Sequence, residues 1–117
     1  MGRLTTHVLD TVSGEPGAGI TVDLYRVAGD DRTHVANIRT NDDGRSEGPI
    51  VEGDAFSAGT YELVFQAGDY FRAAGVAMPD PPFVDQVVVR FGVAQADRHY
   101  HVPILVSPWT YTTYRGS

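Results

Sequence analysis

The sequence predicts an all-β domain, a sandwich or barrel of about eight short strands with one short helix. Short apolar or alternating runs recur along the 117 residues, and clusters of Gly, Pro, Asn and Asp separate them. Only one segment breaks this pattern. Regular short strands with turns this frequent are typical of all-β folds, and the length fits one domain that spans residues 1–117.

The first half of the chain supplies four predicted strands. LTTHVLD at residues 4–10 precedes the turn-rich SGEPGAG, and ITVDLYRV at 20–27 alternates cleanly between apolar and polar side chains. After the turn GDDR, THVANIRT at 33–40 is the next strand, and a short one near 49–51 follows the turn NDDGR. Alternation with a period of two puts one face of a strand in the core.

The second half supplies four more strands. GTYELVFQA at residues 59–67 sets Tyr, Leu and Phe against Glu, Val and Gln. VDQVVVRFGV at 84–93 and HYHVPILV at 99–106 complete the larger set, and WTYTTYR at 109–115 is the last.

The short helix is predicted in DYFRAAGVAMP, residues 69–79, which has no alternation. Asp69 can cap its start and Gly75 can end it, and the segment stops at Pro79 and the run PDPP.

Composition and charge exclude several classes of function. The chain has no cysteine, so it has neither disulfides nor thiolate metal sites. All nine basic residues are arginine, which removes lysine-based catalysis. The formal charge of −6 argues against nucleic-acid binding, and no apolar run approaches the roughly 20 residues of a membrane span. The N-terminus lacks the apolar core of a signal peptide, so we expect a cytoplasmic protein.

Two histidines lie two residues apart in one predicted strand, so His99 and His101 would point to the same side. One interpretation is an exposed face without a function. A second is a zinc site, since His-x-His can supply two ligands and His7 could add a third. A third is catalysis, because imidazole titrates near ~6.5 and can act as a base at neutral pH. The pair alone leaves these alternatives open.

Further polar groups suit a binding or catalytic site. His7 shares a strand face with Thr5 and Leu9, although a lone histidine in a strand is more often structural. Arg45 follows the tight turn NDDG, and its planar guanidinium suits a carbonyl-rich or anionic ligand. The chain end YTTYRGS is rich in Tyr and Thr, so we expect it to pair as a strand rather than fray.

Several familiar catalytic motifs are absent. The sequence has no Gly-x-Ser-x-Gly elbow, no His-Glu-x-x-His helix and no Gly-rich phosphate loop. An enzyme built from these parts would depend on His, Arg and hydroxyl groups, a combination that favours hydrolysis by a histidine-activated water.

Four stretches together resemble 5-hydroxyisourate hydrolases, the transthyretin-related proteins of purine catabolism. They are LTTHVLD, TNDDGRSEGPI, the DYF stretch and HYHVPILVSPWTYTTYRGS, and the terminal YRGS combined with HVLD and HxHVP is highly specific. The resemblance covers essentially the whole chain. It implies a two-sheet, eight-stranded transthyretin-like sandwich with one short helix. It also implies a homotetramer, a dimer of dimers, with the site in a cleft at the dimer–dimer interface.

The resemblance further implies an activity and its site residues. The activity is hydrolysis of 5-hydroxyisourate, the product of urate oxidation, to 2-oxo-4-hydroxy-4-carboxy-5-ureidoimidazoline, with no cofactor. The implied catalytic residues are His7, Arg45, His101 and Ser117, and the implied substrate-binding residues are His7, Arg45, Tyr114 and His99. One departure from the family pattern is Thr110, which follows Trp109 where we expect Gly after Tyr or Phe.

These residues suggest a mechanism in which a neutral histidine takes a proton from water, and the water attacks the ring carbonyl next to nitrogen. Arg45 would hold the substrate oxygens and offset the charge on the carbonyl, so a metal is not needed. Whether His7 or His101 is the base stays open. The alternative function is a transthyretin-like carrier of a small aromatic ligand. Such carriers lack the His7, His101 and YRGS set, so the sequence favours the enzyme.

Overall fold

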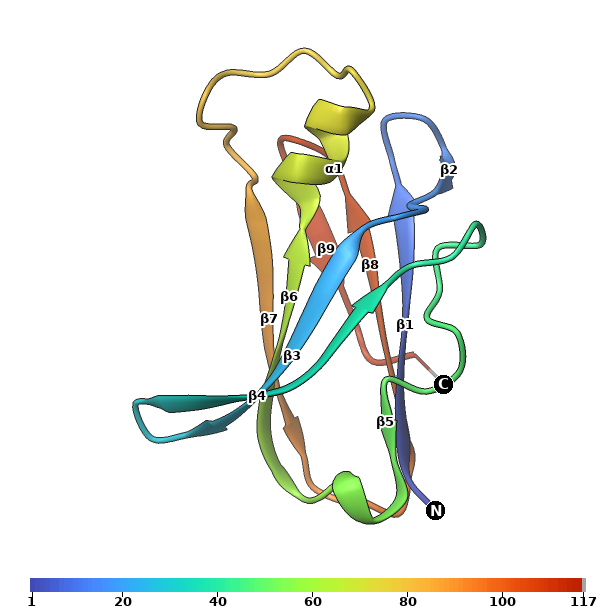
Figure 1. The fold of residues 1–117 in the computed structure, drawn as a ribbon, viewed down its shortest axis with the longest axis vertical. Helices are drawn as coiled ribbons and strands as arrows, with labels where there is room; N and C mark the ends of the chain where they lie inside the picture. The colour runs from blue at the N-terminus through green and yellow to red at the C-terminus, as the bar shows by residue number, and fades with distance from the viewer. Residues whose placement is uncertain (117) are drawn as a thin grey trace.

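Two β-sheets pack against each other in the structure, a computed structural model that describes residues 1–116 (Figure 1). The described part holds nine strands, one α-helix and one short 3-10 helix, which confirms the predicted all-β fold class. The elements in chain order are β1 (Arg3–Asp10), β2 (Glu15–Pro16), β3 (Thr21–Ala28), β4 (Asp31–Arg39), β5 (Val51–Glu52), η1 (Gly53–Ala55), β6 (Gly59–Gln66), α1 (Ala67–Ala73), β7 (Gln86–Val93), β8 (His99–Val106) and β9 (Tyr111–Thr113).

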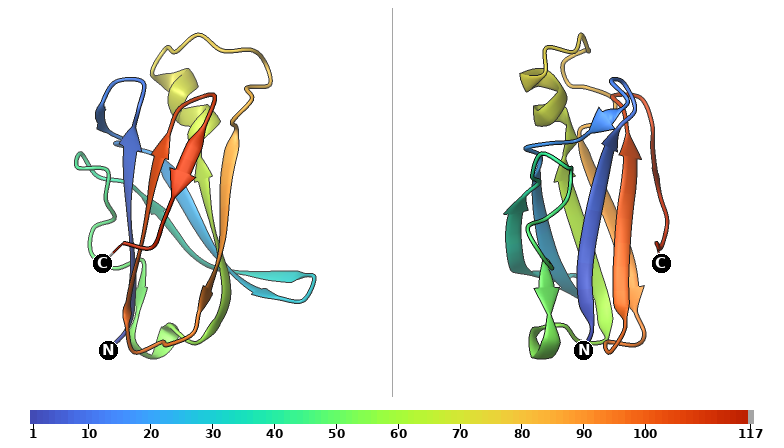
Figure 2. Two further views of the ribbon diagram at one scale, coloured as in Figure 1. Left: turned by 180° about the vertical axis from the view of Figure 1, so that it is seen from behind. Right: turned by 90° about the vertical axis from the view of Figure 1, so that its right-hand side faces the viewer.

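Distant parts of the chain meet in the first sheet, which has the strand order β2-β1-β8-β9, with β5 paired to the start of β1. The second sheet has the order β4-β3-β6-β7. β1 and β8 run parallel, with Arg3 opposite His99 and Thr5 opposite His101. The edge-on view in Figure 2 places β8 and β9 on the opposite side of the molecule from β3 and β4. The parallel pairing therefore brings the N-terminal strand beside the predicted histidine pair.

The core lies between the sheets and follows from the alternation of the strands. β1 buries every second residue from Leu4 to Asp10 and leaves the residues between them partly accessible. On β6, Leu63 and Phe65 are fully buried, and on β8 Ile104 is. Each such side chain contributes about 1.5–3 kcal/mol to the stability of the fold. Because Tyr100 and Val102 of β8 point into this core, the residues that alternate with them face away from it.

One polar cluster lies on the outer face of the second sheet. Glu62 of β6 is only 6% exposed. Its two carboxylate oxygens accept hydrogen bonds from Arg32 at 3.1 Å and Arg90 at 2.9 Å. The buried carboxylate is therefore paired on both sides.

The helix begins earlier than the sequence predicts. α1 starts at Ala67 and its N-cap is Gln66, so the expectation that Asp69 caps the helix is wrong. The buried residues Ala67 and Gly68 continue directly from β6, and Asp69 lies in the first turn, where it pairs with Arg72 at 2.9 Å. Gly75 follows the end of α1 as expected: it has a φ of +76° and donates its N–H to the carbonyl of Arg72.

Several strand boundaries also differ by one or two residues from the predicted ones: β4 begins at Asp31 rather than residue 33, and β7 at Gln86 rather than residue 84. Residues 13–19, expected as a turn, contain the two-residue strand β2, which pairs with the end of β1 and brings the total to nine. A strand this short shows no alternation, so the sequence carries no signal for it. β9 ends at Thr113, before the expected residue 115.

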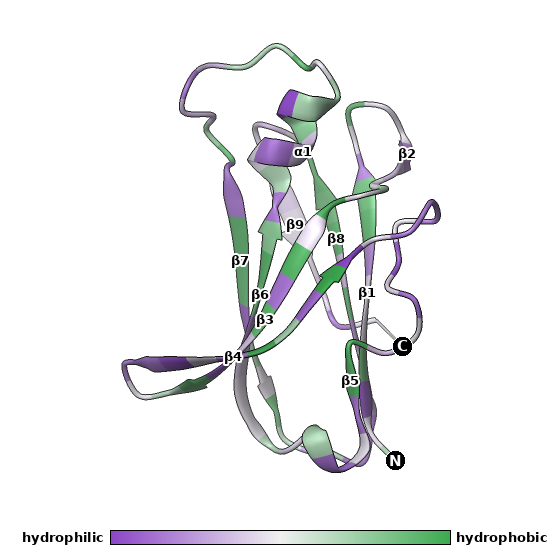
Figure 3. Cartoon of the chain, viewed as in Figure 1, coloured by the Kyte–Doolittle hydropathy of each residue, from purple (hydrophilic) through white to green (hydrophobic). Residues whose placement is uncertain are grey.

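The hairpin of β3 and β4 projects from the sandwich, and its free end is mostly hydrophilic (Figure 3). β4 is accordingly exposed along most of its length. Among residues 1–116, the structure contains no helix with the length and apolar character needed to cross a membrane.

Candidate active site

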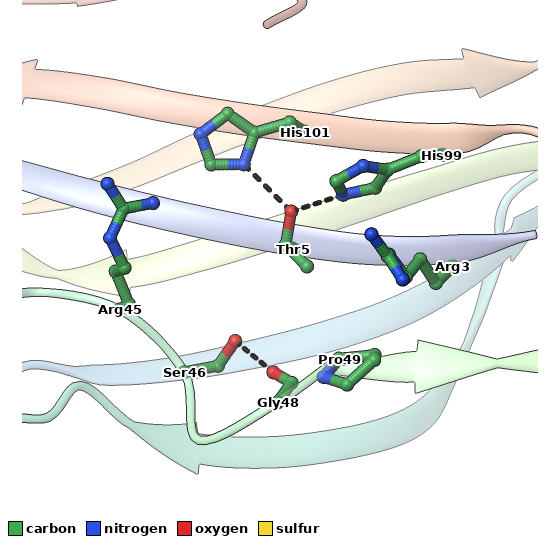
Figure 4. A pocket seen from close by; sticks show the side chains of 8 residues that line it. All are labelled: Arg3, Thr5, Arg45, Ser46, Gly48, Pro49, His99 and His101. Carbon is green, nitrogen blue, oxygen red and sulfur yellow. Dashed lines mark hydrogen bonds between the residues drawn. The ribbon is translucent and has the colours of Figure 1, made fainter. Parts of the chain in front are cut away.

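A pocket of about 410 Å³ opens on the face of β1 and β8 that points away from the core (Figure 4). Its lining residues come from β1, from β8 and from the segment between β4 and β5. They are Arg3, Thr5, Arg45, Ser46, Gly48, Pro49, His99 and His101. The volume suits a small molecule. Two of these eight residues are arginines and none is acidic, so the pocket favours a ligand rich in carbonyl or anionic oxygens.

Thr5 links the two histidines of β8. Its Oγ1 lies 2.7 Å from Nε2 of His99 and 2.8 Å from Nδ1 of His101, and both contacts are drawn in Figure 4. The two imidazole rings lie 6.1 Å apart between centroids. The expectation that both histidines face one side of the strand is confirmed, because both side chains line the pocket. A single hydroxyl on the neighbouring strand orients the pair.

Arg45 reaches the pocket because a tight turn docks on β1. Oδ1 of Asn41 accepts the Arg45 N–H at 3.1 Å, and the carbonyl of Gly44 accepts the Val8 N–H at 2.9 Å. Gly44 has a φ of +76°, and a Cβ there would lie 2.5 Å from the Val8 carbonyl oxygen, so the turn requires glycine. Asp43 accepts a hydrogen bond from Nε of Arg45 at 3.1 Å, but this pair is exposed and weak.

His7 lies beside the pocket and does not line it. It shares the face of β1 with Thr5, is half-buried, and forms an isolated β-bridge with Arg45. Its parallel partner on β8 is Pro103, two residues beyond His101. Its charge is close enough to His101 to affect the pKa of that imidazole. His7 can therefore affect the pocket through two of its lining residues, Arg45 and His101.

Burial and nearby cations lower the pKa of both pocket histidines. Burial is the main cause that lowers the pKa of His101 from its ordinary 6.5, and Arg45, His99 and His7 lower it further. Burial also lowers the pKa of His99, with a contribution from Arg3. A neutral imidazole can accept a proton, so the site holds two potential bases at neutral pH.

The end of the chain runs back along β8, as the prediction of a paired tail requires. Gly116 donates its N–H to the carbonyl of His101 at 2.8 Å. A Cβ on Gly116 would lie 2.5 Å from Cδ2 of His101, so glycine permits this close approach. Tyr114 is 57% exposed and lines a different hollow, next to Tyr100. Ser117 lies outside the described residues.

The predicted site residues are thus brought together in part. Arg45, His99 and His101 line one pocket, His7 adjoins it, and Tyr114 faces elsewhere in the single chain. For the zinc alternative, residues 1–116 contain no group of three or more His, Cys, Asp or Glu side chains placed to hold a metal ion.

Comparison of the sequence with known protein families identifies a match. The model of the HIUase/Transthyretin family matches residues 4–116. The chain belongs to this family. A curated member from Rhizobium meliloti (strain 1021), 5-hydroxyisourate hydrolase 2, is 61% identical over 99% of this chain and 97% of its own length.

Solved structures of the HIUase/Transthyretin fold agree with this assignment. The 5-hydroxyisourate hydrolase of Klebsiella pneumoniae matches 98% of this chain and 99% of its own, with a TM-score of 0.81 and 32% identity. A crystal structure of (S)-allantoin synthase matches 99% of this chain with a TM-score of 0.93 and 45% identity, and this chain spans 44% of that longer chain. The predicted family and fold are confirmed.

Two residues of the pocket have no predicted role. They are Arg3 and Thr5, both of which line the pocket. The available signal for Thr5 was that it shares a strand face with His7. Its position opposite His101 depends on the parallel pairing of β1 with β8, which the alternation of single strands does not reveal.

Proposed function

We propose that the protein is an enzyme that hydrolyses 5-hydroxyisourate in purine catabolism. The observation that carries this proposal is the pocket lined by two imidazoles with lowered pKa values and by two guanidinium groups. Curated relatives that match nearly the whole chain are named 5-hydroxyisourate hydrolases. The predicted class of enzyme, a hydrolase of cyclic amides, agrees with these relatives.

The proposed reaction begins when a neutral histidine takes a proton from water, whose oxygen attacks the ring carbonyl next to nitrogen. Arg45 stabilises the negative charge that builds on the carbonyl oxygen. The carbon–nitrogen bond then breaks, the proton passes to the leaving nitrogen, and the carbonyl carbon becomes a carboxylate. Arg3, at the other end of the pocket, offers a second cation to the oxygens of substrate and product (Figure 4).

The other two predicted site residues are Tyr114 and Ser117, and their proposed role depends on assembly of several copies of the chain. Tyr114 and Ser117 would hold the substrate ring by hydrogen bonds. Because Tyr114 is exposed and lies away from the pocket of its own chain, we propose that a homotetramer, a dimer of dimers, completes the site.

An exposed apolar pair supports self-association. Phe83 is 76% exposed and Trp109 is 58% exposed. Their rings stack at 6.4 Å on the loops that flank β7 and β9, the last strands of the two sheets. Large apolar groups that remain exposed in a monomer often mark contacts with another protein.

A carrier of a small aromatic ligand is the second candidate, because the family name covers transthyretin as well. A carrier needs a pocket of suitable shape but has no need of neutral histidines beside arginines. The lowered pKa values of His99 and His101 therefore favour the enzyme.

The test is the decay of freshly generated 5-hydroxyisourate, followed by ultraviolet absorbance with and without the protein. The hydrolase should accelerate the decay in proportion to its concentration. A decay rate equal to the uncatalysed one, together with binding of an aromatic ligand, would support the carrier. Location in the cytoplasm stays a prediction, which fractionation of the source cells would check.

A further inference from the structure

The contact of Thr5 with both histidines restricts where protons can lie. A threonine hydroxyl has one hydrogen, so it donates one hydrogen bond and must accept any other. Oγ1 of Thr5 is within hydrogen-bond distance of Nε2 of His99 and of Nδ1 of His101 at the same time. When both imidazoles are neutral, at least one of them must therefore donate to Thr5, because the hydroxyl can donate to only one of them.

Two arrangements place the hydrogen of the Thr5 hydroxyl between the oxygen and one of the two rings, and they give His101 opposite roles. In the first, His101 carries its proton on Nδ1 and donates it to Thr5, which donates to His99. Nε2 of His101 then has a free lone pair. In the second, Thr5 donates to Nδ1 of His101, so the proton of His101 is on Nε2 and that atom cannot accept another. Of these two, only the first makes His101 a base; if both rings donated to Thr5, Nε2 of His101 would again be free.

The surroundings of His101 favour the first arrangement. Its Nε2 points toward the side of the pocket where the guanidinium of Arg45 lies (Figure 4). Among the charges that lower the pKa of His101, Arg45 has the largest effect. A guanidinium only donates hydrogen bonds, so it stabilises a lone pair on Nε2 and disfavours an N–H there. His99 is exposed and meets solvent in either tautomer.

We propose that Thr5 is a positioning residue that holds His101 in the Nδ1-protonated tautomer, with His99 as the acceptor of the Thr5 hydrogen, so that Nε2 of His101 is the base. This inference rests on the proposed hydrolase function and names the base that the sequence left open between His7 and His101. When Nε2 takes a proton from water, the N–H on Nδ1 stays bonded to Thr5. The hydroxyl thus supports the imidazolium that forms without changing its own orientation.

The charges that face His101 fit this role. Arg45 on the loop before β5, His99 on β8 and His7 on β1 each lower the pKa of His101, and Arg3 on β1 lowers the pKa of His99. These groups disfavour a positive charge on His101 before the reaction begins. Within residues 1–116, Thr5 is the residue that contacts Nδ1 of His101, the ring nitrogen that faces away from Arg45.

Two substitutions separate the hydroxyl from the shape of the side chain. Thr5→Val keeps the branched shape and removes the hydroxyl, whereas Thr5→Ser keeps the hydroxyl. Thr33→Val is the matched control, because Thr33 is an exposed strand threonine on β4 of the other sheet. Nitrogen-15 NMR of each intact protein, without substrate, reports which ring nitrogen of His101 carries the proton.

The wild type should show His101 protonated on Nδ1, and Thr5→Val should shift it toward the Nε2-protonated form. Thr5→Val should also lower kcat by at least about tenfold and alter the pH profile of kcat. Thr5→Ser should restore both readouts, and Thr33→Val should change neither.

A wild-type spectrum with the proton of His101 on Nε2 would overturn the inference, and it does not depend on whether any variant folds. Thr5→Val with an unchanged tautomer and unchanged kcat would overturn it as well, as would a folded Thr5→Ser that is as impaired as Thr5→Val. Failure of the wild type to hydrolyse 5-hydroxyisourate would instead reject the proposed function, and the spectra would still decide the tautomer.

Discussion

The charge of the pocket differs in sign from the net charge of the whole chain. The protein carries a formal charge of −6, yet Arg3 and Arg45 are the charged residues that line the pocket. Burial and these cations lower the pKa values of the imidazoles between them, which favours the neutral form of both rings. Local placement, rather than net charge, therefore determines what the site can bind and which proton it can accept.

The pH dependence of activity follows from these shifts. A lowered pKa keeps an imidazole unprotonated to a lower pH, so kcat/KM should stay level as the pH falls through 6.5 and decline only below it. Initial rates, corrected for uncatalysed decay, give this profile. In an NMR titration, Arg45→Gln should raise the pKa of His101, whereas Arg39→Gln, an exposed arginine outside this pocket, should not. An acid limb above 6.5 would contradict the assignment of the base.

At the scale of elements, alternation predicted the long strands but not their partners. The strands β1, β3, β6 and β8 lie where the sequence places them. The start of α1 and the two-residue strand β2 were missed, because contacts with neighbouring strands rather than local sequence define them. The pairing of β1 with β8 was also invisible in the sequence, and for this reason Thr5 received no role although His101 did. Arg45 was found because the turn before it has a recognisable sequence.

Glu62, on the outer face of the second sheet, offers a test of stability at this scale. Hydrogen bonds from Arg90, and then Arg32, lower the pKa of Glu62 from its ordinary 4.5. The carboxylate therefore stabilises the fold fully above pH 4.5 and loses this contribution as the pH falls through its lowered pKa. Glu62→Gln should cost about 1–3 kcal/mol at neutral pH.

The same variant should also show a smaller loss of stability on acidification than the wild type does. Urea unfolding across the acid range measures both effects. Asp30→Asn, which changes an exposed carboxyl in the turn between β3 and β4, is the control and should behave as the wild type. Parallel acid profiles for Glu62→Gln and the wild type would show that Glu62 has no special part in acid stability.

At the scale of the whole molecule, the sandwich leaves its site open. The pocket lies on the face of a sheet rather than inside the domain, and Tyr114 faces another hollow. Neighbouring copies would enclose such a site, and the exposed pair of Phe83 and Trp109 offers a surface for them. The sequence predicted this assembly only through the family resemblance, because alternation describes one chain and not its contacts.

A variant that stays monomeric should therefore be inactive. Phe83→Glu combined with Trp109→Glu places charges on the exposed apolar pair and should disrupt self-association. Val35→Glu, which changes an exposed side chain on the projecting hairpin, is the control. Light scattering gives the oligomeric state, and the substrate-decay assay gives the rate. A folded monomer with full activity would reject a site completed by other copies.

The central claim is that imidazoles from β1 and β8 and the guanidinium of Arg45 act together on a water and a ring amide. The most direct measurement is turnover of 5-hydroxyisourate by His7→Ala, Arg45→Ala and His101→Ala, each compared with the wild type. A thermal unfolding curve of each variant first checks that the fold is kept. The account predicts that each substitution removes most of the turnover, on the order of a hundredfold or more, while the fold is kept. Near-normal rates in the folded Arg45→Ala and His101→Ala variants would contradict it.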